Sequence, residues 1–275
     1  MLIKRRRPKK WVVFLAMLVS ATCLVGVVSV RKAPVIVQPA IPALCAETLA
    51  AEGPISICPA YQPGEKLTYR VSWEKILLAG TAELSVTGGG TNLQFHLKAF
   101  TSPSIAALCN LQDDFLSTYD GILGAPARYE KNFSLKQKTV KEIVTFNQLG
   151  KSAQWMSAGR QTQELSIEVG TQDPISALYS VRNLGLKPGL RLILPFVDGS
   201  KNYLLEVSVV NAELVSISTG TFNALRAEVN WRLAGQPVSS RRITLWLTND
   251  SRKIPVLAAV TLPIGTGLVE LISIS

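Results

Sequence analysis

Apolar and polar residues alternate along much of this chain, and the alternation limits its possible folds more than any other feature. In the segment KLTYRVSW, residues 66–73, every second residue is apolar. A period of two is typical of a strand that buries one side and exposes the other. Similar segments recur to the C-terminus, roughly a dozen in all. Asp198-Gly199 marks a tight hairpin between two of them.

These strands predict a mainly β fold. Because short turns join consecutive segments, we expect a large antiparallel sheet that forms an open or half barrel with one packed α-helix. The hairpins continue throughout the body of the chain. Residues 60–275 are therefore predicted to form a single β-rich domain.

The segment DPISALYSVRNLGLKPG, residues 173–189, carries the signals of that helix. Asp173 is suited to cap the N-terminus, and Pro174 fits the first helical position. Gly185 and then Pro188 are typical of a helix end. We therefore predict one helix of about eleven residues between these signals.

Arg182 is the unexpected residue of this helix. At about 100° per residue it falls between Leu178 and Ile175, on the apolar side. A buried guanidinium is costly unless it is paired, so Arg182 requires a partner. It either pairs with a strand carboxylate and pins the helix to the sheet, or binds a ligand. In the second case Arg182, Tyr179 and Ser176 would contact an anionic or hydroxylated head group at the mouth of a sheet-lined cavity.

The N-terminus has the composition of a membrane anchor. Residues 1–10 contain six basic residues and no acid, and residues 11–30 contain no charge. Twenty helical residues, at about 1.5 Å each, cross a bilayer core. We predict a basic cytoplasmic tail (1–10), a transmembrane signal-anchor helix (11–30) and an extended Pro/Ala linker (31–59) before the exported domain.

The charge asymmetry around this helix orients the chain. The basic tail stays inside, which places the C-terminal domain of an inner-membrane, single-pass protein in the periplasm or outside the cell. The alternative is a signal peptide that is cleaved, which would release a secreted protein. Both remain open at this point.

The formal net charge of +10 belongs mostly to the N-terminal region. Residues 1–32 hold eight basic residues and no acid, which leaves 21 basic against 19 acidic residues in residues 33–275. Such a nearly neutral body has no basic stripe that could follow a phosphate backbone. We expect no nucleic-acid partner. The expected partners are the membrane, through residues 11–30, and a lipid or an envelope protein.

The cysteines and the single histidine limit the chemistry. Cys45 and Cys58 lie 13 residues apart and predict a disulfide in an oxidising compartment, with unpaired thiols as the alternative. The chain has no C-x-x-C motif, so we expect no metal site and no cofactor. Ser-His-Asp and Cys-His catalysis both depend on His96, which falls on the polar side of its strand. We therefore predict no catalytic residue and no enzymatic activity.

Several motifs resemble one known family. In chain order they are PGEKLTYRVSW, LLAGTAELSV, DPISALYSVRNLGLKPG, TGTFNALRAEV and TLWLTNDSRKIPVLAAV. Together they resemble the bacterial domain-of-unknown-function 3108 family over residues 60–275. The resemblance implies an exported, mostly β protein and assigns no activity, substrate or cofactor.

The resemblance also selects positions. The helix motif of the family is matched by Asp173, Ser176, Tyr179 and Arg182. Its strand and turn motifs are matched by Trp73, Gly80, Asp250 and Pro255, which we expect to be structural.

The function expected from these features is non-catalytic binding in the cell envelope. The ligand would be amphipathic, a lipid or a glycolipid, held on the concave face of the sheet. One alternative is an assembly scaffold that binds another envelope protein through a strand edge. A second alternative is a hydrolase that uses a pair of carboxylates from distant strands.

Overall fold

In the computed structural model, the described part of the chain is residues 59–275, without 107–111, 136–137, 235, 238–241 and 263–264. The predicted tail, anchor helix (11–30) and linker, and the Cys45–Cys58 bridge, lie outside the described residues, except Pro59 at the linker's end. Within the described part, neither helix is long and apolar enough to cross a membrane.

The strands of the first half form consecutive hairpins. They are β1 (Lys66–Trp73), β2 (Leu77–Gly89), β3 (Asn92–Thr101), β4 (Gln112–Asp120), β5 (Ala125–Leu135), β6 (Lys138–Asn147), β7 (Ser152–Ser157) and β8 (Gln163–Ser166). A four-residue helix, α2 (Pro103–Ala106), follows β3. It is absent from the sequence prediction, which gives the β-rich domain one helix only.

The second half follows α3 (Pro174–Arg182). Its strands are β9 (Arg191–Asp198), β10 (Lys201–Ile217), β11 (Gly220–Leu233), β12 (Gln236–Pro237), β13 (Arg242–Thr248), β14 (Pro255–Leu262) and β15 (Gly265–Ile274). The first and last strands, β1 and β15, pair with each other and join the two halves.

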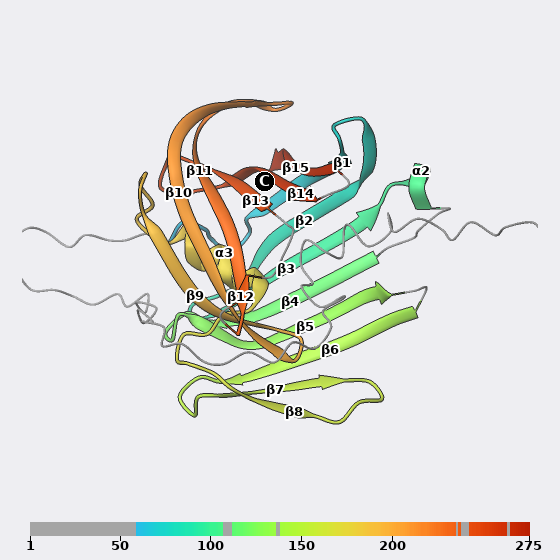
Figure 1. Cartoon of the computed structure of the whole chain (residues 1–275), viewed down its shortest axis with the longest axis vertical. Coiled ribbons are helices and arrows are strands. Elements are labelled where there is room, and N and C mark those ends of the chain that lie inside the picture. Colours follow the sequence, from blue (N-terminus) through green and yellow to red (C-terminus); the bar gives the residue numbers. More distant parts are fainter. Residues whose placement is uncertain (1–58, 107–111, 136–137, 235, 238–241, 263–264) are drawn as a thin grey trace, which may run out of the picture.

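All strands belong to one 15-stranded antiparallel sheet that starts at β8 and ends at β9. The sheet curves strongly, as Figure 1 shows, but it does not close by pairing its end strands. Near the gap, Gln172 bridges to the β9 edge and the Asn202 amide donates to the Ser166 carbonyl (2.6 Å). The predicted mainly β fold with one large, open antiparallel sheet is therefore confirmed.

The alternation predicted for β1 is confirmed by burial. Leu67, Tyr69 and Val71 are buried on the concave face, whereas the residues between them are partly exposed. Helix α3 packs on this face, against β9, β3 and β4 (Figure 1). The ring of Tyr179, the one aromatic residue of this helix, packs among aromatic residues of the sheet at the centre of the core. It stacks on Phe95 with a centroid separation of 4.0 Å.

The start of α3 is as predicted. The Asp173 carboxylate accepts from the backbone N–H groups of Ile175 (2.8 Å) and Ser176 (2.9 Å), and Pro174 occupies the first turn. The Ser176 hydroxyl accepts from the Asp173 N–H, which completes a capping box. The helix ends at Arg182, before the predicted stop at Gly185, and the side chain of its C-cap residue Asn183 donates to the Tyr61 hydroxyl and accepts from the Ala60 N–H.

The β10–β11 hairpin extends past its neighbours (Figure 1). Strand β9 pairs with β10 only as far as Ser208, whereas β11 pairs with it to Ile217. Side-chain contacts hold the hairpin in place: Trp246 donates to Glu213 (2.7 Å), and the Ser218 hydroxyl donates to Glu270. In the described part of the chain, residues 211–217 of β10 thus form a free strand edge.

Candidate functional site

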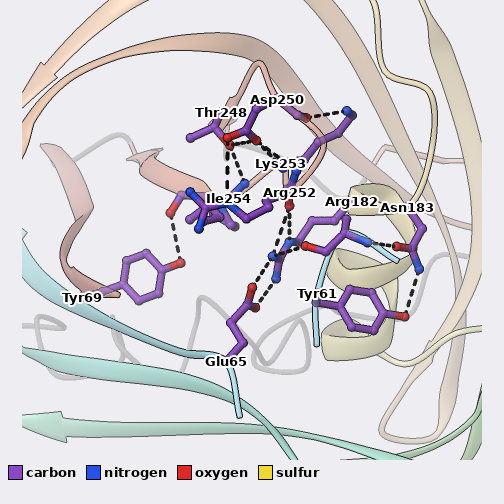
Figure 2. Close-up of polar contacts among 12 residues, drawn as sticks. Tyr61, Glu65, Tyr69, Arg182, Asn183, Thr248, Asp250, Arg252, Lys253 and Ile254 are labelled. Carbon is purple, nitrogen blue, oxygen red and sulfur yellow. Dashed lines mark hydrogen bonds and ion pairs between the residues drawn. The ribbon is translucent and has the colours of Figure 1, made fainter. Parts of the chain in front are cut away.

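Arg182 is buried at the C-terminal end of α3, with 1% of its surface exposed. Figure 2 shows its guanidinium between three segments that are distant in sequence. It forms a bidentate ion pair with Glu65, just before β1, at 2.7 and 2.8 Å. It also donates to the carbonyls of Ala60 (3.0 Å) and Arg252 (3.2 Å). Each guanidinium nitrogen therefore already has a protein acceptor.

The electrostatics of this pair favour the charged arginine. Burial alone would lower the pKa of Arg182, but the hydrogen bonds and the charge of Glu65 outweigh burial and raise it. The rings of Tyr179 and Tyr61 lie 5.1 and 5.7 Å from the guanidinium carbon and add cation–π contacts. Of the two interpretations of Arg182, the structure contains the first: a carboxylate at the start of a strand pairs with it.

The turn between β13 and β14 presents the Arg252 carbonyl to Arg182. The Asp250 carboxylate orders this turn by accepting from the Thr248 hydroxyl (2.6 Å) and from the backbone N–H groups of Arg252 and Lys253 (3.0 Å each). Tyr69 of β1 donates to the Pro255 carbonyl (3.0 Å) at the end of the same turn. Of the positions selected by the family motifs, Asp250 thus orders the turn that contacts Arg182 (Figure 2), and Pro255 begins the strand after this turn and lines the apolar cavity described below.

The other motif positions lie elsewhere. Gly80 lies in β2, where a Cβ atom would be 2.1 Å from the Phe100 carbonyl oxygen. Only glycine fits such a close approach of two strands. Trp73 ends β1 and pairs with Leu77 and Gly267.

An apolar cavity of about 250 Å³ lies between α3 and the sheet. The helix contributes Pro174, Ile175, Ala177, Leu178 and Val181 to its lining. The opposite walls come from both halves of the sheet, and include Val71, Ala99, Val229, Trp231, Leu257 and Ala258. Asp198, at the end of β9, is the only charged residue of this lining.

The predicted ligand contacts, Arg182, Tyr179 and Ser176, are not among the residues that line this cavity. Around the helix, at about 100° per residue, Tyr179 and Ser176 fall outside the arc of the lining residues, and Arg182 falls at its edge, between Leu178 and Ile175. The Ser176 hydroxyl is occupied in the capping box, and Tyr179 packs on Phe95. The helix thus contributes apolar residues to the cavity and, from its C-terminal end and an adjacent part of its surface, the polar contacts that anchor it.

A second buried charge cluster, which the sequence interpretation missed, lies next to the cavity. The Lys131 ammonium of β5 contacts Asp198 (2.6 Å) and Glu142 of β6 (3.0 Å), and is 1% exposed. Burial alone would lower the pKa of Lys131, but the two carboxylates raise it. The sequence signal was present: Lys131 falls between Tyr129 and Phe133 in the apolar register of its strand.

Asp173 is the other buried acid near this end of α3. Burial raises its pKa to about 6, although the hydrogen bonds from Ser117, Ser176 and Ile175 act in the opposite direction. The Ser117 hydroxyl of β4 donates to its second oxygen at 2.5 Å. Asp173 therefore ties the helix start to the sheet as well as capping the helix.

The described residues contain no group of three or more His, Cys, Asp or Glu side chains that could hold a metal ion. His96 contacts Asp114 (2.5 Å), and both side chains are partly exposed. His96 is thus paired at the surface, away from the lining of the cavity.

Comparisons with known proteins concern the fold and the family. A family model described as "Protein of unknown function (DUF3108)" matches residues 68–272. No curated protein matches the chain. The crystal structure of a β-barrel-like protein of the domain of unknown function DUF1849 from Brucella abortus is similar, with a TM-score of 0.54 at 11% identity over 77% of this chain and 96% of that chain. The hypothetical protein CT021 of Chlamydia trachomatis gives a TM-score of 0.37 at 12% identity, over 78% of this chain and 87% of that one.

Proposed function

The chain belongs to the DUF3108 family of proteins of unknown function, and we propose that it binds one apolar chain of an amphipathic ligand in the cavity beside α3, without catalysis. The observation that carries this proposal is the lining of the cavity, which is apolar apart from Asp198. Burial of a hydrocarbon chain against such walls gains about 25 cal/mol per Å² of apolar surface.

The size of the cavity limits the ligand. A dry cavity of about 150 Å³ accepts a molecule such as benzene, and pockets for whole drug-sized ligands span about 300–1,000 Å³. A volume of about 250 Å³ falls between the two. It suits a single alkyl chain or part of one, and it is too small for a complete two-chain lipid.

The ion pair and hydrogen bonds of Arg182 support this function because they hold the helix that forms part of the cavity lining. Leu178 and Val181 line the cavity, and Arg182 holds the same helix to Glu65 and Arg252. The contacts of Arg182 with Glu65 and Arg252 fix the position of the helix, so the helix does not move into the cavity and fill it. Arg182 is thus proposed to be structural, with the ligand beside the neighbouring apolar residues of α3.

The location proposed for this binding is the cell envelope. The uncharged segment 11–30 after a basic tail would hold the domain at the outer side of the inner membrane, with secretion after cleavage as the alternative. Either place brings the domain close to amphipathic molecules.

A carboxylate-based hydrolase is disfavoured by the geometry of the buried acids. Asp198 and Glu142 share the ammonium group of Lys131, and the residues are 0% and 9% exposed. Acids that act on a glycosidic bond need access to substrate and water. These two carboxylates are instead held by a cation within the core.

A photoactivatable probe tests the proposed binding. We would add a single-chain alkyl diazirine to cells that produce the full chain, irradiate them and map the modified residues by mass spectrometry. The expected modifications lie on cavity residues such as Leu178, Val229 and Leu257. Labelling confined to exposed apolar residues, such as Ile76 or Leu214, would reject the proposal.

A matched pair of variants sharpens the same experiment. Ala258→Phe places a ring in the cavity and should abolish the cavity labelling, because Ala258 lines it. Ala212→Phe makes the same change on the exposed side of β10 and should leave labelling unchanged. Equal labelling in both variants would show that the probe does not occupy the cavity.

The free edge of β10 favours a second candidate function, the binding of a protein partner by strand addition. Residues 211–217 pair only with β11, and Glu213 is their one charged residue. Leu214 is 76% exposed on this strand. Exposed edges without charged protection accept an additional strand. Leu214→Lys should then abolish capture of the partner in cells by cross-linking, whereas an unchanged set of cross-linked proteins would reject this candidate.

A further inference from the structure

The turn between β1 and β2 carries a cluster of exposed apolar residues. Ile76, Leu77 and Leu78 follow one another in the sequence and are all exposed, and Ile76 has an exposed fraction of 90%. Nowhere else in the described part of the chain are three consecutive large apolar residues exposed. Apolar groups of this kind are costly in water and mark sites of interaction.

The backbone holds this turn in a defined shape. Glu74 and Lys75 both have a positive φ, 51° and 61°, and the Ile76 N–H donates to the Trp73 carbonyl (3.0 Å). Two successive residues other than glycine in this conformation are costly, and such strain concentrates at functional sites. The Glu74 N–H donates to the Thr266 carbonyl (2.8 Å), and the Glu74 carboxylate accepts from the Thr266 N–H. The turn is therefore fixed to β15, with Ile76 projecting from it.

The end of this hairpin is apolar on both faces of the sheet. Trp73 follows Val71 on the concave face, and Leu77 pairs with Trp73 and lies on the same face. Leu78 is the next residue and points to the convex face, where Phe100 of β3 is also exposed. A protein partner that packs on a sheet contacts one face of it, whereas a bilayer surrounds an inserted end on every side. The two apolar faces therefore favour lipid over protein as the partner.

The residues at this end also suit the border between lipid and water. Trp73 is partly exposed, and tryptophan is enriched at membrane interfaces. Lys75 is exposed at the turn itself, where its aliphatic stem can lie along apolar groups while the ammonium stays among lipid phosphates. On the concave face, Trp73 is followed by Val71, and Val71 and its β15 partner Val269 line the cavity. An apolar surface thus leads from the turn to the cavity.

The length of the chain before the described domain allows the turn to reach a bilayer. Residues 31–58, which separate the proposed anchor from the described part, number 28 and span at most about 90 Å. Ala60 binds Arg182 beside the start of β1, so the tether joins the domain at the end of β1 that is away from the turn. The eight residues of β1 cover about 27 Å. The tether is therefore long enough for the turn to face the membrane.

We propose that the β1–β2 turn inserts into the surface of the lipid bilayer and that apolar chains pass along Trp73 and Val71 between the bilayer and the cavity. The insertion stands on the turn alone. The passage of chains rests on the proposed function, because it requires that the cavity holds an apolar chain.

Photo-cross-linking from the turn tests the insertion. Photoreactive benzoyl-phenylalanine replaces Ile76 in the full chain, produced in cells, and the adducts formed on irradiation are identified by mass spectrometry. Replacement of Leu149 is the matched control, because Leu149 is 75% exposed in the β6–β7 turn at the opposite end of the strands. Phospholipid adducts should be at least fivefold more abundant from position 76 than from position 149. Equal adducts, no lipid adducts, or adducts with protein alone at position 76 would overturn the insertion.

A charged turn tests the passage of chains. The double variant Ile76→Asp with Leu77→Asp should lower labelling of the cavity residue Leu178 at least fivefold when a long-chain alkyl diazirine is supplied in the membrane. A short-chain diazirine that dissolves in water reaches the cavity without a bilayer, so it should label Leu178 equally in this variant and in wild type. Leu149→Asp is the control and should leave both labellings unchanged.

The outcomes separate the two proposals. Equal labelling of the double variant and wild type by the long-chain probe, or loss of labelling by both probes, would contradict passage along the turn while the proposed function stands. If neither probe labels Leu178 in wild type, the proposed function fails and the passage of chains fails with it. The lipid adducts at position 76 then still decide whether the turn inserts.

Discussion

Arg182 and Glu65 are 117 residues apart in the sequence and form a bidentate ion pair at 2.7 and 2.8 Å inside the protein. The pair joins α3 to the start of β1, which is next to β15, the last strand of the chain. It therefore fixes the helix to the place where the two halves of the sheet join.

Removal of one partner of this pair should be strongly destabilising. Arg182→Met leaves Glu65 and the carbonyls of Ala60 and Arg252 without their donor, and we expect a loss of about 3–5 kcal/mol in the free energy of unfolding. The double variant Arg182→Met with Glu65→Leu should recover much of this loss, since no charge is left unpaired. Urea unfolding followed by tryptophan fluorescence measures both. A double variant no more stable than the single one would show that the carbonyl contacts, and not the ion pair, dominate.

Lys131 should behave in a comparable way. Lys131→Met leaves the buried carboxylates of Asp198 and Glu142 without a cation, and we expect a loss of about 3–5 kcal/mol. Lys141→Met is the control, because Lys141 is exposed and lies 3.5 Å from Glu130 in a surface pair. Such a surface pair contributes about 0–1 kcal/mol. Similar losses in both variants, measured by urea unfolding, would contradict the interpretation of Lys131 as a core residue.

Asp173 should make stability fall as the pH rises from about 4 to about 6. Its pKa is about 6 in the folded protein, above the ordinary 3.8, so the folded state binds the proton more tightly than the unfolded state. The contribution of Asp173 to the free energy of unfolding is therefore greatest below pH 4. On the order of 3 kcal/mol of this contribution is lost once the pH exceeds 6.

The variant Asp173→Asn isolates this contribution. Asparagine still caps the helix but does not titrate, so the difference in unfolding free energy between wild type and variant should change across pH 4–6 and stay constant above pH 7. Thermal unfolding at a series of pH values measures this difference. A pH-independent difference would show that Asp173 titrates as in the unfolded chain.

Gly80→Ala should test the close approach of β2 and β3. A methyl group there would lie 2.1 Å from the Phe100 carbonyl oxygen, so the strands must separate. We expect a loss of about 1–3 kcal/mol, the usual cost of overpacking. Gly89→Ala, in the same strand and with no atom within 4 Å, is the matched control and should change stability little. Equal melting temperatures for the two variants would contradict the prediction.

The sequence predicted features that depend on neighbouring residues. The alternation in β1 and the Asp173-Pro174 start of α3 are local, and both agree with the structure. That Arg182 needs a partner also followed from its place on the helix. The identity of that partner did not, because Glu65 reaches Arg182 only through the packing of α3 against a strand far away in the sequence.

The residues that line the cavity could not be predicted from the sequence for a different reason. Its walls are the ends of side chains from many strands, and a change of one residue in strand register would replace all of them. The helix wheel placed Arg182 beside Leu178, but a borderline position between two faces does not tell which one meets the cavity. Lys131 is a charged residue in the apolar register of its strand, and this register alone indicates that it is buried.

Trp231 offers the most direct measurement of the central claim, since it lines the cavity. Alkyl chains with a bromine near the tail quench the fluorescence of a tryptophan that they touch. We would titrate a long-chain alcohol that carries a bromine near its tail into the full chain, and compare wild type with Trp231→Phe. We expect saturable quenching in the wild type that is largely lost in Trp231→Phe and in Ala258→Phe. Quenching of the same size in all three proteins would contradict the presence of an apolar chain in this cavity.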